Sequence, residues 1–466
     1  MRARHLAIIV LMFTTSKGFP QVSGDVPNAN RINAYVTAFN AGDDAMAAFV
    51  KENVAESALR NRSVADRVTI YRQMHDRLKT IGIKSVPSVE VSGQQLSVTV
   101  RMKSSSVGDV DIVFLFEPAP PNKLIALRVE DAEGPASQHS EDSAPAAKIS
   151  ESEFTKKVSD YLDEATKRDE FSGVVLIARG GKPVLEKAYG FADKGKQLPN
   201  NWDTKFNLGS INKIFTRICI DQLVSQGKLA YADKLGNLLP DYPNKDAREK
   251  VTIAHLLTMR SGIGDFFGER YDATPKSKLR NLADYLPLFA DQPLLFEPGT
   301  KSQYSNGGYV VLGLIIEKVT GQSYYQYVKQ HVFDPAGMND TESYFTEQNV
   351  PNRAAGYTLE RSKLHVRLDN VFSRPNRGSS AGGGYSTAAD MLNFTKALSS
   401  GNLTMYSAET GKPEIGAMGI AGGAPGINAA LDFDPRSGNT IIVLSNYDPP
   451  AATNVAMQVR TWIRGL

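Results

Sequence analysis

A serine and a lysine three residues apart, Ser210 and Lys213, are the first residues in this sequence that could do chemistry together. They stand at the head of a segment in which apolar residues recur at helical spacing up to about Gln226, and Gly227 is a natural stop. On a helix, residues three apart share a face, with Cβ atoms about 5–6 Å apart. A lysine whose pKa is lowered by burial or by a nearby cation can take the proton of a serine hydroxyl and make it a nucleophile.

The same spacing also fits an ordinary helix N-cap with a solvated lysine one turn later. A second copy of the pattern, Ser225 and Lys228, straddles Gly227, where the helix should end, so that these two residues need not share a face. The Ser210 pair therefore needs partners elsewhere in the chain before it indicates catalysis.

The second candidate cluster is Tyr304-Ser305-Asn306, which follows Pro298-Gly299. A tyrosine phenol beside a lysine ammonium ionises more readily, which makes Tyr304 a candidate acid/base. Asn306 could hydrogen-bond a substrate carbonyl or orient the lysine, although Asn-Gly-Gly also fits a plain turn. A similar triplet, Tyr242-Pro243-Asn244, lies in a polar, proline-broken segment that is typical of a protein surface.

The third cluster is glycine-rich and runs from Gly422 and Gly423 to Gly426, just before an expected strand at 428–434. Closely spaced glycines let a backbone approach a ligand, and a free N–H there could stabilise an oxyanion. Taken alone, this cluster is a turn between two strands.

Composition limits the classes of protein to which the chain can belong. Its 466 residues favour two domains, and 41% hydrophobic with 22% charged residues is ordinary for a globular protein. A net charge of +3 gives no argument for nucleic acid binding. The single cysteine, Cys219, excludes an internal disulfide and a cysteine-based zinc cluster, and its place in the Ser210 helix predicts a buried thiol.

Residues 1–24 are predicted to be an export signal. Arg2 and Arg4 precede an apolar run from Leu6 to Phe13, and small residues at 23–24 could mark cleavage. The apolar run is too short to span a bilayer, and no later run of 18 apolar residues follows. We therefore expect an exported (periplasmic or secreted) protein without a stable membrane anchor.

Residues 25–133 are predicted to form a small α+β domain. Two helices are expected between Ile32 and Gly82, with a break of the first region near Gly42-Asp43 as an alternative. Strands are expected at 88–91, 96–102, 110–116 and 124–129. This outline resembles the NTF2-like domains, although no motif supports the likeness. Because no catalytic residue types cluster here, a packing or docking module with an unknown partner is expected. Residues 134–150, rich in Ser, Ala, Pro and acidic residues, are predicted to be a flexible linker.

Residues 151–466 are predicted to form one α+β domain. A helix at 152–167 is followed by strands at 173–179 and 183–189, joined by a Gly180-Gly181 hairpin turn. Residues 221–400 are mainly helical with many turns. Strands are expected again at 415–421, 428–434 and 440–445, before a closing helix at 452–463.

Together the three clusters resemble the serine β-lactamase-like, penicillin-binding family, in its esterase, class C and D-aminopeptidase branch. The resemblance covers about residues 150–466 and is carried by Ser210 to Lys213, Tyr304 to Asn306 and Gly422 to Gly426. It is supported by further short sequence segments, which are Val251 to Thr258, Ser261-Gly262, Phe296 to Gly299, Tyr304 to Gly308, Ala381 to Gly384 and Ser386 to Asp390.

The resemblance implies a fold and a set of roles. The fold is an antiparallel sheet flanked by helices, with a mainly helical middle. Ser210 would be the acylated nucleophile, while Lys213 and Tyr304 would take its proton and return it to the leaving group. Asn306 would hold the substrate, and the N–H groups of Ser210 and Gly423 would form the oxyanion hole beside Gly422. No metal and no cofactor are implied, and the partner is a small acyl substrate.

One position departs from the family pattern. Two residues before Gly422 the family usually carries a lysine, a histidine or another polar residue, whereas this chain has Ile420, followed by Ala421. A cation there would bind a substrate carboxylate and help keep Lys213 deprotonated by charge repulsion. Isoleucine does neither, so the sequence favours neutral esters over β-lactams and D-amino-acid peptides, and it leaves a weak or inactive enzyme open.

Other residues of the sequence suggest different activities. Gly378 to Gly382, with Ser380, matches a nucleophile elbow, but that fold needs a histidine after the serine, and the last of the six histidines is His365. His255 is expected to be a buried structural histidine. A β-lactamase or D-amino-acid peptidase remains an alternative, as does a non-catalytic binding protein that keeps the fold.

Overall fold

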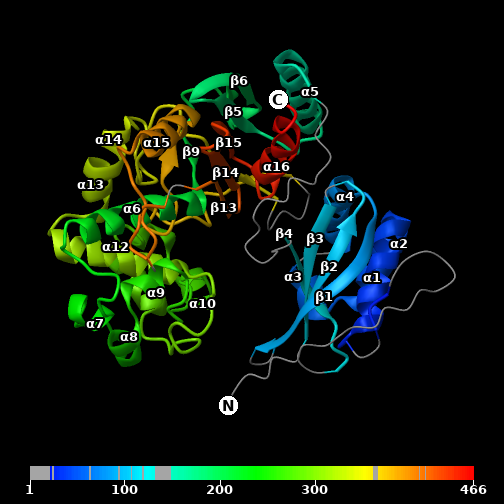
Figure 1. The fold of residues 1–466 in the computed structure, drawn as a ribbon, viewed down its shortest axis with the longest axis horizontal. Helices are drawn as coiled ribbons and strands as arrows, with labels where there is room; N and C mark the ends of the chain where they lie inside the picture. The colour runs from blue at the N-terminus through cyan, green and yellow to red at the C-terminus, as the bar shows by residue number, and fades with distance from the viewer. Residues whose placement is uncertain are drawn as a thin grey trace. The chain divides into compact units, whose positions relative to one another are not determined.

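The computed structural model divides the chain into two compact units, Met1–Ser143 and Ala144–Leu466. It describes residues 21–23, 26–61, 64–92, 95–106, 108–117, 120–131, 148–359, 366–408, 410–414 and 416–466. Figure 1 shows the helices and strands of each unit. The predicted export signal lies almost wholly outside the described residues, as does most of the predicted linker.

The first unit pairs helices with an antiparallel meander of four strands in the order β1-β2-β3-β4. One face of the sheet carries the core, because buried residues alternate along β2 at Val98, Val100 and Met102. The elements are α1 (Ala29–Ala41), α2 (Asp43–Asn53), α3 (Glu56–Asn61), α4 (Val64–Leu78), β1 (Ile81–Ser92), β2 (Gln95–Ser104), β3 (Gly108–Phe116) and β4 (Leu124–Asp131).

Two details of the first unit differ from the sequence prediction. Four helices, not two, precede the sheet. Gly42 adopts φ 103° and separates α1 from α2, at the break that the sequence offered as an alternative, and α3 is a further short helix that was not predicted. The first strand begins at Ile81 rather than Ser88, with Ile81 and Ile83 both buried. The likeness to NTF2-like domains stays a prediction.

The second unit is organised around a five-stranded antiparallel sheet in the order β13-β14-β15-β5-β6. Its strands bring the two ends of the unit together, since β5 pairs with β15. β13 is the edge strand on the side of the candidate site. The strands are β5 (Gly173–Arg179), β6 (Lys182–Tyr189), β13 (Met418–Ala424), β14 (Ile427–Asp434) and β15 (Asn439–Ser445).

Each face of this sheet packs against a different set of helices. On one face, Val175 and Ile177 share a core with α5 (Glu151–Lys167) and α16 (Ala451–Ile463). On the other face, Val174 and Leu176 join the large core formed with the helical middle. This alternation is the pattern of a strand that is buried on both faces. It confirms the predicted α+β fold of antiparallel sheet and flanking helices.

Helix α6 (Asn212–Ser225) lies at the centre of the large core, with Phe215, Ile218 and Cys219 buried. The buried thiol of Cys219 was predicted. The other helices of the middle are α7 (Leu235–Leu238), α8 (Lys245–Lys250), α9 (Ile253–Leu257), α10 (Glu269–Ala273), α11 (Leu286–Phe289), α12 (Asn306–Thr320), α13 (Tyr324–Val328), α14 (Asp334–Ala336) and α15 (Ala388–Ser400).

Short pieces of secondary structure complete the second unit. Three-residue or four-residue 3₁₀ turns occur at η1 (Gly209–Ile211), η2 (Lys276–Lys278) and η3 (Leu282–Tyr285), and a π-helical turn, η4, spans Lys329–Phe333. Small antiparallel pairs form between β7 (Phe191–Asp193) and β8 (Leu198–Pro199), β9 (Phe206–Asn207) and β12 (Tyr385–Ser386), and β10 (Tyr357–Thr358) and β11 (Leu368–Asp369). None of the described helices has both the length and the apolar character of a membrane span.

Candidate active site

Ser210 lies in the middle of the 3₁₀ turn η1, immediately before α6, rather than in the first turn of the α-helix, where the sequence predicted it. The turn is tight because Gly209 adopts φ +52° and packs against the backbone of Gly422 and Gly423, where a Cβ atom would come within 2.8 Å of the Gly423 nitrogen. The Ser-x-x-Lys spacing still brings the two side chains together. Lys213 Nζ lies 3.3 Å from Ser210 Oγ.

Lys213 is buried, with 7% of its surface exposed. Its Nζ donates hydrogen bonds to Asn306 Oδ1 at 2.7 Å and to the carbonyl oxygen of Ala381 at 2.6 Å. Burial lowers the pKa of Lys213 to about 7, although the negative charge of Asp265 acts in the opposite direction. A neutral amine held by two acceptors keeps its lone pair for the Ser210 hydroxyl, which is what a general base needs.

Tyr304 completes the contacts of the serine. Its hydroxyl donates to Ser210 Oγ at 2.6 Å, and Lys213 Nζ lies 4.6 Å from the centre of its ring. The sequence prediction that Tyr304 ionises more readily is wrong, because loss of hydration raises the pKa of this phenol and outweighs the hydrogen bond to Ser210. Tyr304 is half-exposed, at 50%, and suits the role of a proton donor.

Asn306 orients Lys213 in this structure. Asn-Gly-Gly does not form a free turn but opens helix α12, where Ser305 is the N-cap and its Oγ accepts from the Gly308 N–H at 2.9 Å. Asn306 Nδ2 donates to Asp265 Oδ2 at 2.7 Å, so that Oδ1 must face the lysine. Of the two roles that the sequence allowed, the contact with Lys213 is the one that the described residues make.

Asp265 is a residue of the site that sequence reasoning missed. Its carboxylate fixes the orientation of the Asn306 amide. Its negative charge opposes the lowering of the Lys213 pKa by burial. It lies close after Ser261-Gly262, a segment that supports the family resemblance, but its partner Asn306 is 41 positions away in the sequence. Only that segment could have drawn attention to it.

Gly422 and Gly423 belong to strand β13, and the turn that follows consists of Pro425 and Gly426, so the prediction that this cluster is itself a turn is only partly right. A Cβ atom on Gly422 would lie 2.0 Å from the carbonyl oxygen of Leu208, which leaves room for glycine alone. In an antiparallel ladder, hydrogen-bonded and non-hydrogen-bonded pairs alternate, starting from a bonded pair at a two-residue turn. The Gly423↔Asn428 pair is therefore non-bonded, and the Gly423 N–H points to the open edge beside Ser210.

Two cavities meet at Ser210 and Tyr304. The first has a volume of about 500 Å³ and contains Lys213, Ile420 and a run of aliphatic side chains. The second has a volume of about 340 Å³ and is lined by Asn306, Gly423 and several aromatic rings, which are Phe266, Phe267, Tyr271 and Tyr285. The nucleophile is thus reached from two sides with different chemistry.

The residues that mimic these motifs lie elsewhere. Ser225 ends α6 and donates its hydroxyl to the Gln222 carbonyl oxygen at 2.8 Å. Ser380 is fully buried and donates to the Tyr309 carbonyl oxygen at 2.8 Å, so the rejected nucleophile elbow has no accessible hydroxyl. Tyr242 is buried at 4% exposure and belongs to the main core, although Pro240, Asp241 and Pro243 beside it are exposed, as predicted for a surface segment.

His255 is half-buried and structural. Its Nδ1 accepts from the Thr252 N–H at 3.3 Å in the capping box of α9. Burial lowers the pKa of His255. Over the residues that the structure describes, no three His, Cys, Asp or Glu side chains gather in a way that could hold a metal ion.

Comparison with known proteins agrees with this arrangement. The family described as Beta-lactamase matches residues 158–462. The putative penicillin-binding protein PbpX of Bacillus subtilis is 33% identical over 305 residues, which cover 62% of this chain and 73% of that protein. The match to penicillin-binding protein 4* of the same organism is 32% identical and spans 46% of this chain and 48% of that protein.

Solved structures share the fold of the second unit. A penicillin-binding protein from Bacillus halodurans aligns with a TM-score of 0.57 and 30% identity, covering 64% of this chain and 99% of that one. EstCE1, a hydrolase with promiscuous acyltransferase activity, aligns with a TM-score of 0.54 over 67% of this chain and 99% of its own. At 22% identity, this last likeness concerns the fold alone.

Proposed function

This chain belongs to the Beta-lactamase family, whose relatives include serine hydrolases, and we propose that it hydrolyses esters and related small acyl substrates through an acyl-enzyme on Ser210. The observation that carries the proposal is the double contact of Ser210 Oγ, which lies 2.6 Å from the Tyr304 hydroxyl and 3.3 Å from Lys213 Nζ. A serine held between a lysine of lowered pKa and a protonated phenol has both a base and an acid within reach.

In acylation, the neutral amine of Lys213 takes the Ser210 proton while Oγ forms a bond to the substrate carbonyl carbon. The N–H groups of Ser210 and Gly423 receive the developing oxyanion. The bond from carbon to the leaving oxygen then breaks, and the proton passes from Lys213, through Tyr304 or directly, to that oxygen. Water repeats the sequence on the acyl-enzyme and releases the acid.

Neutral substrates are favoured because position 420, in a cavity that Ser210 also lines, is aliphatic. Ile420 is half-buried and packs against the main core, and it offers a carboxylate no partner. Among the described residues that line this cavity, the cations are Lys213 and Arg217, and Arg217 is paired with Glu414 at 2.7 Å. Removing a carboxylate from water without a counter-charge is costly. We further propose that the first 24 residues direct export.

A serine-reactive fluorophosphonate tests the assignment directly. We expect a covalent adduct on Ser210, together with hydrolysis of a short-chain nitrophenyl ester. Ser210→Ala should remove the adduct and lower the rate of hydrolysis by about three orders of magnitude or more. Ser225→Ala is the matched control and should leave both unchanged. A peptide map that places the label on Ser380 would contradict the proposal.

A further inference from the structure

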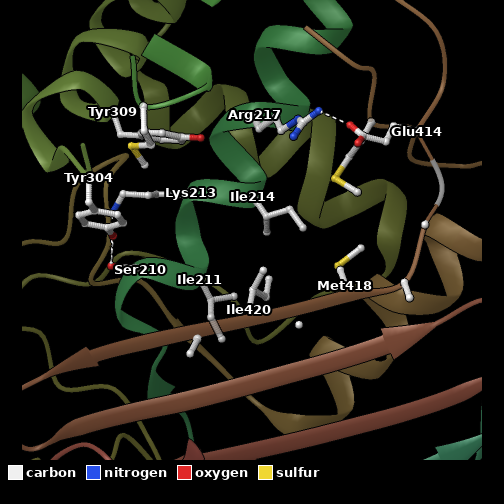
Figure 2. Close-up of a pocket in the computed structure, with 16 residues that line it drawn as sticks. Ser210, Ile211, Lys213, Ile214, Arg217, Tyr304, Tyr309, Glu414, Met418 and Ile420 are labelled. Carbon is white, nitrogen blue, oxygen red and sulfur yellow. Dashed lines mark hydrogen bonds and ion pairs between the residues drawn. The ribbon is translucent and has the colours of Figure 1, made fainter. Parts of the chain in front are cut away.

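The cavity on the Lys213 side of the nucleophile has two chemically distinct ends. Ser210, Lys213 and Tyr304 stand at one end, and the ion pair of Arg217 with Glu414 stands at the other, as Figure 2 shows. The volume of about 500 Å³ is enough for a substrate group of several carbon atoms.

The walls between these ends are aliphatic. Ile211 and Ile214 come from η1 and α6, and Met418 and Ile420 face them from β13 (Figure 2). Residues 418 and 420 share one face of the strand, because side chains alternate along it. These four side chains offer a polar group on the substrate no hydrogen bond, whereas an alkyl chain beside them would be removed from water. Tyr309 also lines the cavity, and its hydroxyl already donates to the Leu257 carbonyl oxygen at 3.3 Å.

A well-anchored charge pair lines the far end. Arg217 lies four residues after Lys213 on α6, which is roughly 6 Å along the helix axis. Its Nη2 donates to Glu414 Oε2 at 2.7 Å and to the Tyr406 carbonyl oxygen at 2.5 Å, and its Nε lies 3.5 Å from the buried carboxylate of Asp221. The Glu414 side chain is 56% exposed, so that solvent begins just beyond the pair.

The positions of Lys213 and Gly423 favour one orientation of a substrate over the other. Among the described residues, Tyr304 lines both cavities, whereas Lys213 lines this cavity and not the second, and Gly423 lines the second and not this one. The leaving oxygen must receive the proton that Lys213 took from Ser210, while the carbonyl oxygen must turn toward Gly423. The leaving group therefore extends along the aliphatic walls, and the acyl group extends toward the aromatic side.

We propose that this cavity binds a short, unbranched alkyl chain of the leaving alcohol, and that the Arg217–Glu414 pair sets the longest chain that fits. The inference rests on the proposed ester hydrolysis and names its substrate class, which is esters of short apolar alcohols. Ile420 then acts in specificity as part of an alkyl-binding wall.

The test compares two ester series on the full chain. In the first, acetate esters of ethanol, 1-butanol, 1-hexanol and 1-octanol are followed by pH-stat titration. We expect kcat/KM to rise roughly threefold per methylene at first, because each buried methylene adds to binding, and to fall for octyl acetate. In the second series, nitrophenyl esters vary only in acyl length.

Glu414→Ala opens the far end and should move the optimum of the alcohol series to a longer chain, while the acyl series keeps its shape. Glu414→Gln retains the side-chain volume and should keep the wild-type optimum. Glu170→Ala breaks a different exposed pair, that of Arg168 with Glu170 at 2.9 Å, and should not change the profile. Circular dichroism establishes that each variant is folded.

The affinity of the cavity for alcohols of different length can also be ranked without turnover. Each free alcohol is added during fluorophosphonate labelling of Ser210, and the decrease in labelling rate reports its binding. 1-Hexanol should protect at a lower concentration than ethanol. No label on Ser210 would reject the proposed function itself. Two results would overturn this inference alone, provided that Ser210 is labelled. In the first, neither the hydrolysis rates nor the protection by free alcohols depends on the length of the alcohol. In the second, Glu414→Ala shifts the optimum of the acyl series instead of that of the alcohol series.

Discussion

The residues around Ser210 fall into two groups with different functions, which we call the polar side and the aliphatic side. On one side, polar groups form a continuous hydrogen-bonded chain from Ser210 through Lys213 and Asn306 to Asp265. Ile420 belongs to the second group, the aliphatic side, which is the aliphatic wall of the cavity that Lys213 also lines. The polar side fixes where a proton can go, and the aliphatic side determines which substrate can come close.

This contrast shows how the base is kept neutral. The sequence allowed two ways of lowering the pKa of Lys213, burial or a nearby cation, and Ile420 removes the second. In the structure, burial lowers the pKa of Lys213 to about 7, and no neighbouring cation is needed. The aliphatic residue at position 420 is therefore compatible with an active base, and a weak or inactive enzyme is not required by this substitution.

The largest expected effect comes from breaking the polar side. Lys213→Ala and Tyr304→Phe should each reduce acylation by roughly 10²- to 10⁴-fold, because both residues handle the same proton. The double variant should be little worse than the poorer single variant. Pre-steady-state bursts of nitrophenol report acylation. If the double variant loses the product of the two single effects, the residues act independently and the proposed proton route is wrong.

The aliphatic side is tested next, through Ile420→Lys and Ile420→His. Wild type should prefer a neutral ester over a chromogenic cephalosporin by a wide margin in kcat/KM. A cation at position 420 should narrow that margin about tenfold to a hundredfold, since a charge-assisted hydrogen bond contributes roughly 1–3 kcal/mol. Efficient cephalosporin turnover by wild type would contradict the argument and would point to Arg374, which lines the second cavity.

A smaller effect is expected in the pH dependence of kcat/KM. Because the neutral form of Lys213 is the base, kcat/KM should rise with pH and reach half of its plateau near pH 7. The pKa of Tyr304 is raised above its ordinary 10.0, so its ionisation should not lower the rate below that pH. Asp265→Asn removes the charge that raises the pKa of Lys213 and should move the midpoint to lower pH.

The control for this variant is Asp203→Asn, which changes an exposed carboxylate in the same unit. The amide at position 265 can still accept from Asn306, so the plateau of kcat/KM should fall only a few-fold. A midpoint that moves to higher pH, or that does not move, would show that Asp265 does not act on Lys213 by its charge.

The sequence could predict those parts of the site that are local in the chain. Ser210 and Lys213 are one turn apart, and the strands β5, β14 and β15 follow from alternating or continuous apolar residues between glycine turns. Tyr304 and Gly423 required the family resemblance, because their place beside Ser210 depends on contacts far along the sequence.

What the sequence missed depends on tertiary packing. The contact of Asp265 with Asn306 spans 41 positions, and no pattern marks it. The pKa of Tyr304 is raised because loss of hydration outweighs its polar neighbours, and loss of hydration is not visible in a motif. Tyr242 has polar residues and a proline around it, yet its ring is in the main core.

The smallest expected effect concerns the first unit. All the described residues that line the two cavities, polar and aliphatic alike, belong to Ala144–Leu466. Cutting the chain near Ser143 should therefore leave a soluble fragment whose kcat/KM for the neutral ester is within about twofold of the full chain, and whose preference over the cephalosporin is the same. Thermal unfolding checks that the fragment is folded. If the folded fragment has a different preference between the neutral ester and the cephalosporin, the first unit shapes the aliphatic side. If the folded fragment does not hydrolyse the ester at all, the first unit also affects Ser210, Lys213 and their hydrogen-bonded partners.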